Sequence, residues 1–329
     1  METGIIFAML SRKFYRILLC PDGSRSIFLT VSIFAAICLL SVACTSKLTP
    51  APSPVQPTAT VSPVPVATTA VPTPTQTPEP LALRINGEGI LLAEYDAELR
   101  QIQEADQSLA KNAVVEQQRQ QVLDNLTATL LLAQGAAADG FELDDAGLKA
   151  EIDRLAGEMG GEQALTDWMT KYGYSAATFP IALRRQMAAA WERDRIAAQV
   201  PQDAEQIHAR QILTQDETIA NRALEQVKLP GVNFASQALR YDPVTGGDLG
   251  WFPRGYLIQA EVEDAAFKLQ PGEISGVIKS QVGYHILQII AREPARPLSP
   301  DARRVLQHKA IQEWVSKQRE ASKVEVLLP

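Results

Sequence analysis

Few side chains in this chain of 329 residues have types and spacings that could do chemistry. None of its three histidines stands near a cysteine or a pair of carboxylates, so the sequence predicts neither a metal site nor a cofactor. His285, in the run GYHIL, and His208 lie in strand-like segments, where a histidine can be an ordinary sheet residue. Asp242 precedes Pro243, a pair that is typical of a turn.

The run from 246 to 287 is the most informative part of the sequence. It reads GGDLGWFPRGYLIQAEVEDAAFKLQPGEISGVIKSQVGYHIL, and the run IHARQILT stands upstream at 207–214. A glycine motif, an EDAAF helix, a PGEIS turn and the GYHIL strand follow one another in this order. Their order and spacing resemble the parvulin family of peptidyl-prolyl isomerases over about 205–292. The resemblance implies a small β-α-α-β-α-β-β domain that holds a prolyl peptide.

The resemblance also implies a polar cluster. The family has two histidines, a Cys or Asp, and a Ser or Thr linked by hydrogen bonds. His285 matches one histidine, Asp242 the Cys or Asp, and Ser280 the hydroxyl, whereas Gln211 stands where the other histidine belongs. Gln211 can form hydrogen bonds, but it cannot exchange a proton as imidazole does. His208 is expected to be structural or exposed, because a step of three residues along a strand reverses the face.

The family's ring-binding positions fall on Leu249, Leu257 and Val262. A Phe is usual at the third, so the resemblance implies a shallower wall at Val262. Rotation about an X-Pro bond passes a twisted amide roughly 20 kcal/mol above the ground states, and no covalent bond to the substrate is needed. A protein can accelerate it by gripping the proline ring in an apolar pocket and placing polar groups that favour the twisted amide.

The N-terminal segment, 1–43, predicts export. An apolar run at 27–43 follows a basic stretch, the layout of a secretory signal. The run SVAC that ends at Cys44 resembles a bacterial lipoprotein cleavage box, in which the cysteine carries the lipid. An uncleaved membrane anchor is the alternative, since 17 residues is the lower limit of a span. Both interpretations place the protein outside the cytoplasm, attached to a bacterial membrane.

The next segment, 44–80, is rich in Pro and Thr and almost free of charge, which predicts a disordered, extended stalk. A Pro-rich ligand for a partner domain is a second interpretation. The other cysteines, Cys20 and Cys38, precede the expected cleavage site, so no disulfide framework is predicted. The net charge of −7 becomes −9 after removal of 1–43, which holds four basic and two acidic residues. This acidity argues against nucleic acid as a partner.

Apolar periodicity predicts a helical block at 81–203 that resembles the N-terminal chaperone domain of SurA- and PrsA-type foldases. The sequence predicts a short strand at 82–86, which a turn at 86–89 leads into a helix at about 92–109. A second helix is predicted at about 112–138, a third is capped by Asp144 and ended by Gly160, and a fourth runs from Ser175 to Val200. In the segment 294–329, Ser299 and Pro300 predict the start of a helix, and residues 323–328 predict a strand. Both would return to this block, and the strand would pair with that at 82–86. The parvulin-like domain at 204–293 would then be inserted, giving an α+β fold.

Two functions of different classes follow from this organisation. One is prolyl cis/trans isomerisation on unfolded secreted polypeptides that contain X-Pro bonds. The other is a holdase that uses the parvulin fold to bind peptides with little catalysis, and Gln211 and Val262 favour it. A sorting receptor for particular clients would leave no sign in the sequence.

Overall fold

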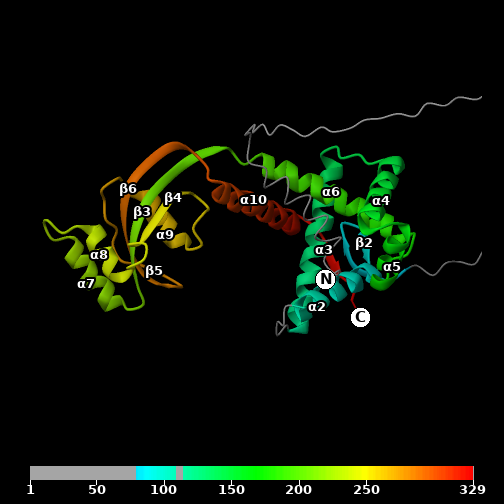
Figure 1. Ribbon diagram of the computed structural model, residues 1–329, viewed down its shortest axis with the longest axis horizontal. Helices are drawn as coiled ribbons and strands as arrows, with labels where there is room; N and C mark the ends of the chain where they lie inside the picture. Colours follow the sequence, from blue (N-terminus) through cyan, green and yellow to red (C-terminus); the bar gives the residue numbers. More distant parts are fainter. Residues whose placement is uncertain (1–78, 109–113, 329) are drawn as a thin grey trace, which may run out of the picture. The chain divides into compact units, whose positions relative to one another are not determined.

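The computed structural model describes residues 79–108 and 114–328 (Figure 1). The predictions for the signal segment, for Cys44 and for almost all of the stalk lie outside these residues. Within the described ranges, no helix is both long and apolar enough to cross a membrane.

A three-stranded antiparallel sheet joins the two ends of the described chain. Its order is β2 (Glu88–Leu91), β1 (Leu81–Ile85), β7 (Val324–Val326). Leu83 pairs with Val326 and Ile85 with Val324, which confirms the predicted pairing of 82–86 with 323–328. The expectation that residues 86–89 turn directly into a helix is wrong. Asn86 and Gly87 both have positive φ, 53° and 91°, so the turn closes a β-hairpin and the chain runs through β2 first.

Six helices accompany this sheet: α2 (Leu92–Ser108), α3 (Val115–Ala138), α4 (Asp145–Met159), α5 (Glu162–Tyr172), α6 (Thr178–Ala198) and α10 (Pro300–Ala321). As predicted, Asp144 caps α4 by accepting a hydrogen bond from the Gly147 amide, and Gly160 ends it in the left-handed conformation. The sequence interpretation missed α5.

Helix α10 packs on the helices that precede it by more than a hundred residues. Ser299 caps α10 and Pro300 opens it, as expected from the sequence. Trp314 and Val315 pack against buried side chains of β1 and α3, and Ala310 packs against Leu132 and Ala189. Side chains of α10 therefore share a core with those of β1, α3 and α6.

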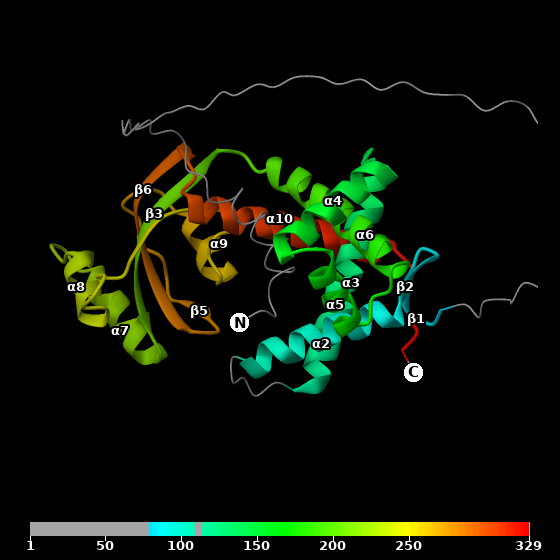
Figure 2. The ribbon, with the colours of Figure 1, turned by 45° about the vertical axis from the view of Figure 1, so that its right-hand side comes forward.

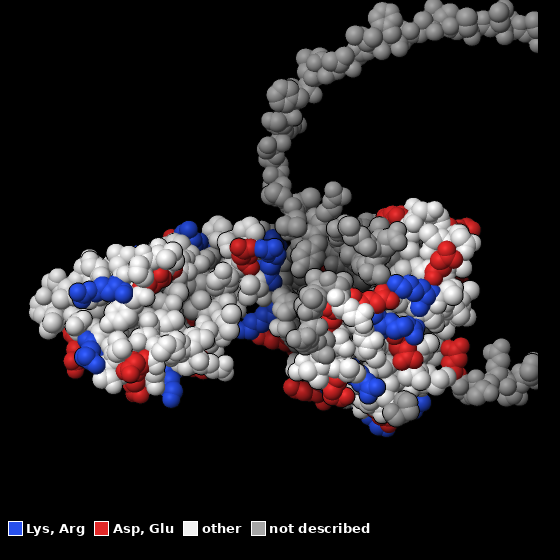
Figure 3. Space-filling model, turned by 60° about the horizontal axis from the view of Figure 1, so that its bottom comes forward, with Lys and Arg blue, Asp and Glu red and all other residues white. Residues whose placement is uncertain are grey.

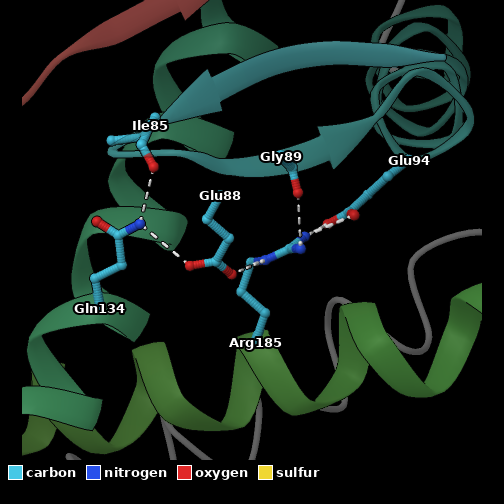
Figure 4. A network of polar contacts seen from close by, with 6 residues as sticks. All are labelled: Ile85, Glu88, Gly89, Glu94, Gln134 and Arg185. Carbon is cyan, nitrogen blue, oxygen red and sulfur yellow. Dashed lines mark hydrogen bonds and ion pairs between the residues drawn. The ribbon is translucent and has the colours of Figure 1, made fainter. Parts of the chain in front are cut away.

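A buried ion pair ties α6 to the hairpin and α2 (Figure 4). Arg185 is 7% exposed and donates to both carboxylate oxygens of Glu94 at 2.7 Å, and it also donates to the carbonyl of Gly89 at 3.4 Å. Half-buried Glu98 lies nearby on α2, and burial, with the charge of Glu94, raises its pKa to about 8.

The second sheet has the strand order β4 (Asp248–Pro253), β3 (Asp203–Thr214), β6 (Gly283–Pro297), β5 (Ile278–Ser280). Helices α7 (Glu217–Val227) and α8 (Phe234–Tyr241) cover one face, and α9 (Ala260–Lys268) covers the other (Figures 1 and 2). The predicted β-α-α-β-α-β-β order is confirmed. Strand β5, which follows the PGEIS turn, is only three residues long, with one isolated bridge from Ile274 to Gln288 before it.

Charged side chains of both signs intermingle on the face drawn in Figure 3, and neither sign forms a continuous patch there. The electrostatic footprint of a nucleic-acid-binding surface, a basic stripe or patch, is absent from that face.

Candidate functional site: a polar triad beside an apolar cluster

Strand register brings the predicted polar residues together. In the β3–β6 pair, Gln211 lies opposite Leu287 and Leu213 lies opposite His285. Residues two apart on one strand point to the same face, so Gln211 and His285 are diagonal neighbours. Strand β5 pairs Ile278 with His285, which places Ser280 on the other side of the histidine.

Gln211, His285 and Ser280 form a hydrogen-bonded triad. His285 Nδ1 lies 2.9 Å from Gln211 Oε1, and His285 Nε2 lies 2.7 Å from Ser280 Oγ. An amide oxygen can only accept, so Nδ1 carries the proton and Nε2 accepts the hydroxyl hydrogen of Ser280. The amide N–H of Val282 donates in turn to Ser280 Oγ at 3.1 Å. Both ring nitrogens are therefore satisfied, and the tautomer is fixed.

His285 is 2% exposed. Burial lowers its pKa from the ordinary value of 6.5, and the carboxylate of Glu261 in the first turn of α9 partly opposes that shift. The imidazole is therefore neutral near pH 7, as the triad's hydrogen-bond pattern requires.

Asp242 is not a member of this triad. Its Oδ1 accepts from the amides of Val244 (3.0 Å) and Thr245 (3.1 Å), and its Oδ2 accepts from Gly247 N at 3.3 Å. The Thr245 hydroxyl also donates to Oδ2, and these bonds, led by that of the hydroxyl, lower the pKa of Asp242. No hydrogen bond joins Asp242 to His285 within the described structure.

Asp242 nevertheless shapes the loop that rests on Gln211. The carbonyl of Gly247 accepts a hydrogen bond from the backbone N–H of Gln211 at 2.8 Å. A Cβ at Gly247, whose φ is +70°, would lie 1.9 Å from the Gln211 carbonyl oxygen, so only glycine permits this approach. Asp242 is therefore connected to Gln211 through one loop and the backbone of β3.

The three predicted ring-binding residues share one apolar cluster on the face covered by α9. Val262 is 2% exposed and packs with Phe252, Phe267 and Leu287, whereas Leu249 and Leu257 are half-buried against them. The surface that a proline ring could reach is therefore that of Leu249 and Leu257, and Val262 supports it from inside. Leu287 follows His285 by two residues, so cluster and triad lie on the same face of β6.

His208 lies outside the triad, as expected. Its Nε2 is 2.8 Å from Asp248 Oδ1, and its ring centroid is 5.5 Å from that of Trp251. These contacts join β3 to β4, which is a structural role. Among the described residues, no group of three or more potential metal ligands gathers at this site or elsewhere.

Sequence reasoning missed Glu263 of α9. This side chain is 8% exposed, and it accepts hydrogen bonds from three consecutive backbone amides, those of Gly255, Tyr256 and Leu257. The one feature of the sequence that could have indicated this role is the position of Glu263 directly after Val262, an apolar residue that faces the core.

Two family models match the chain. The PPIC-type PPIase domain model matches residues 196–291, which include the triad and the apolar cluster. The chain carries a PPIC-type peptidyl-prolyl isomerase domain. The SurA-like N-terminal domain model matches residues 64–190, ahead of the PPIC-type domain.

The chain is similar to proteins named foldase protein PrsA. That of Geobacillus sp. (strain WCH70) is 35% identical over 130 residues, which are 37% of this chain and 45% of the relative. That of Caldanaerobacter subterraneus is 28% identical over 221 residues, 62% of this chain and 71% of the relative. The crystal structure of the peptidylprolyl isomerase PrsA from Bacillus cereus superimposes with a TM-score of 0.40 at 20% identity, over 71% of this chain and 83% of that one.

Proposed function

We propose that the chain is an extracytoplasmic peptidyl-prolyl cis/trans isomerase and foldase that acts on unfolded secreted polypeptides. One observation carries the proposal: a buried, neutral imidazole, hydrogen-bonded at both nitrogens, shares a sheet face with an apolar cluster open at Leu249 and Leu257. The match to the PPIC-type domain and the PrsA relatives support it.

In this mechanism the proline ring packs on Leu249 and Leu257. Gln211 Oε1 is held by His285. Within the described residues, the side-chain Nε2 of Gln211 makes no hydrogen bond, so this NH2 group is free to donate to a substrate oxygen. Donors held in place stabilise the twisted amide without reorganisation, and exclusion of water strengthens each of these bonds. Ser280 and His285 act by holding Gln211 in position.

A holdase is the second candidate. It is favoured by the side chain of Gln211, which cannot switch protonation state, and by Val262, which presents almost no surface to a ring. A protease-coupled isomerisation assay, run beside an aggregation assay with an unfolded client, separates the two. Isomerisation above background supports the enzyme, whereas suppressed aggregation without isomerisation supports the holdase.

We further propose the domain boundaries 81–203, 204–293 and 294–329, in which the third segment returns to the first. Attachment to a membrane through a lipid at Cys44, after removal of 1–43, is also part of the proposal, and it rests on the sequence pattern. Mass spectrometry of the native protein tests it. A lipid-modified Cys44 at the mature N-terminus is expected, whereas an unmodified Cys44 with 1–43 still attached would support the uncleaved anchor.

A further inference from the structure

The carboxylate of Glu263 binds the backbone of the loop that contains Leu257. Its Oε1 accepts from Gly255 N at 2.7 Å, and its Oε2 accepts from Tyr256 N and Leu257 N, both at 3.0 Å. The side chain is 8% exposed, so the carboxylate is largely withdrawn from water. Burying a charge is costly unless hydrogen bonds compensate it, and here three successive backbone donors do so.

Helix α9 makes further contacts with this loop beside Gly255. Gly255 has a φ of +85°. Its neighbour Arg254 lies over the Phe267 ring, 4.2 Å from the centroid, and pairs with Asp264 at 3.5 Å. Both partners belong to α9, as Glu263 does. Helix α9 therefore holds the loop from one side through one cation–π contact, one ion pair and three hydrogen bonds.

The outcome is a defined placement of Leu257. This residue is half-buried against the apolar cluster, whereas the next residue, Ile258, is 94% exposed. Between Leu257 and Ile258 the chain therefore passes from the apolar cluster to the solvent. The three amides held by Glu263 end at Leu257, the last residue before this change.

We propose that Glu263 is a positioning residue for X-Pro binding, which fixes Leu257 as one wall of the prolyl pocket by holding the backbone of residues 255–257. The inference rests on the proposed function. We call the three hydrogen bonds from residues 255–257 to Glu263 the clamp. Because Leu257 contacts the proline ring in both the ground state and the transition state, loss of the clamp weakens the binding of both states to a similar extent. KM and the peptide Kd should therefore rise while kcat changes little.

The test uses Glu263→Gln in the full chain. One amide oxygen cannot accept from all three donors, and the NH2 group would face a backbone N–H. We expect about a tenfold rise in the Kd and KM of an X-Pro peptide, with kcat within about twofold of wild type. NMR amide exchange at residues 255–257 should become faster. The matched control is Glu273→Gln, in the turn after α9. The carboxylate of Glu273 accepts a hydrogen bond from one backbone N–H, that of Gln270, at 2.7 Å.

A double-mutant cycle with Leu257→Ala shows whether Glu263 acts through Leu257. The doubly substituted protein should bind the peptide no more weakly than Leu257→Ala alone, since the clamp then has no wall to position. Additive losses would overturn the proposal. So would faster amide exchange at residues 255–257 with unchanged Kd and KM, which would make the clamp purely structural.

The peptide Kd also separates this inference from the proposed function. If the wild type binds the peptide without isomerising it, and Glu263→Gln weakens binding, the clamp stands and the isomerase assignment fails. If the wild type binds no X-Pro peptide, the clamp proposal fails too.

Discussion

Replacing Gln211 by leucine tests the triad directly. The change keeps the approximate size of the side chain and removes the acceptor that lies 2.9 Å from His285 Nδ1. Because His285 is 2% exposed, its N–H then lacks a partner in a site that water scarcely reaches. An unsatisfied buried donor costs about 1–3 kcal/mol. The same change removes the N–H groups proposed to contact the substrate, and a loss of about 1.4 kcal/mol in transition-state stabilisation lowers kcat/KM about tenfold.

Gln206 offers a matched control in the same strand. It is 2% exposed, and its Nε2 donates to the carbonyls of Arg296 and Pro297 at 2.8 and 3.1 Å. Gln206→Leu should lower the free energy of unfolding by a similar amount, about 1–3 kcal/mol, and leave the rate unchanged. Gln211→His, which restores the residue usual in the family, should raise the rate of the wild type.

Cis–trans exchange of a proline peptide, measured by NMR, gives the rate, and chemical denaturation gives the free energy of unfolding. If Gln211→Leu lowered stability as the control does and left kcat/KM at the wild-type value, Gln211 would have no role in the reaction.

Three further predictions concern stability, measured by denaturation. Trp314→Ala should destabilise the helical block by about 1–3 kcal/mol, since its half-buried ring packs on β1 and α3, and an unchanged unfolding transition would contradict that packing. Glu98→Gln should stabilise the protein by roughly 1–3 kcal/mol near pH 8 and by almost nothing near pH 4.5. The reason is that the raised pKa of Glu98, about 8, makes the wild type lose stability as pH rises from 4.5 towards 8, so an equal gain at both pH values would exclude this cause. Val262→Phe should cost about 1–3 kcal/mol by overpacking, and a stable variant with a faster rate would show that the cluster has room for a ring.

Local signals in the sequence predicted most of the elements. Asp144 and Gly160 mark the ends of α4, and Ser299 with Pro300 marks the start of α10, because cap residues satisfy backbone groups at helix ends wherever the helix packs. The pairing of β1 with β7 also followed from two short alternating strands at opposite ends of the folded region.

The two elements that local signals did not predict are short, and each follows a glycine. Strand β2 has four residues, and its hairpin depends on the positive φ angles of Asn86 and Gly87. An Asn-Gly pair is a common turn signal, and it does not show whether a helix or a second strand follows. Helix α5 has eleven residues between Gly161 and Gly173, although Leu165, Trp168, Met169 and Tyr172 have helical spacing.

The site was only partly predictable for a physical reason. Period-two alternation and strand pairing bring Gln211, His285 and Ser280 together once the sheet order is known. Loop conformation does not follow from such a pattern. The pair Asp242-Pro243 indicated a turn, which agrees with the bonds that Asp242 accepts from its own loop. The sequence could not show that the carboxylate of Glu263 turns back to the amides of residues 255–257.

Exchange NMR measures, without a coupling enzyme, whether this site isomerises X-Pro bonds. The spectrum of a short X-Pro peptide is recorded with the full-length protein and with its Leu257→Ala variant at equal concentration. We expect cis–trans exchange cross-peaks with the wild type, at mixing times where the free peptide shows none, and much weaker ones with the variant. Cross-peaks no stronger than those of the free peptide, or equal for both proteins, would contradict isomerisation at this site.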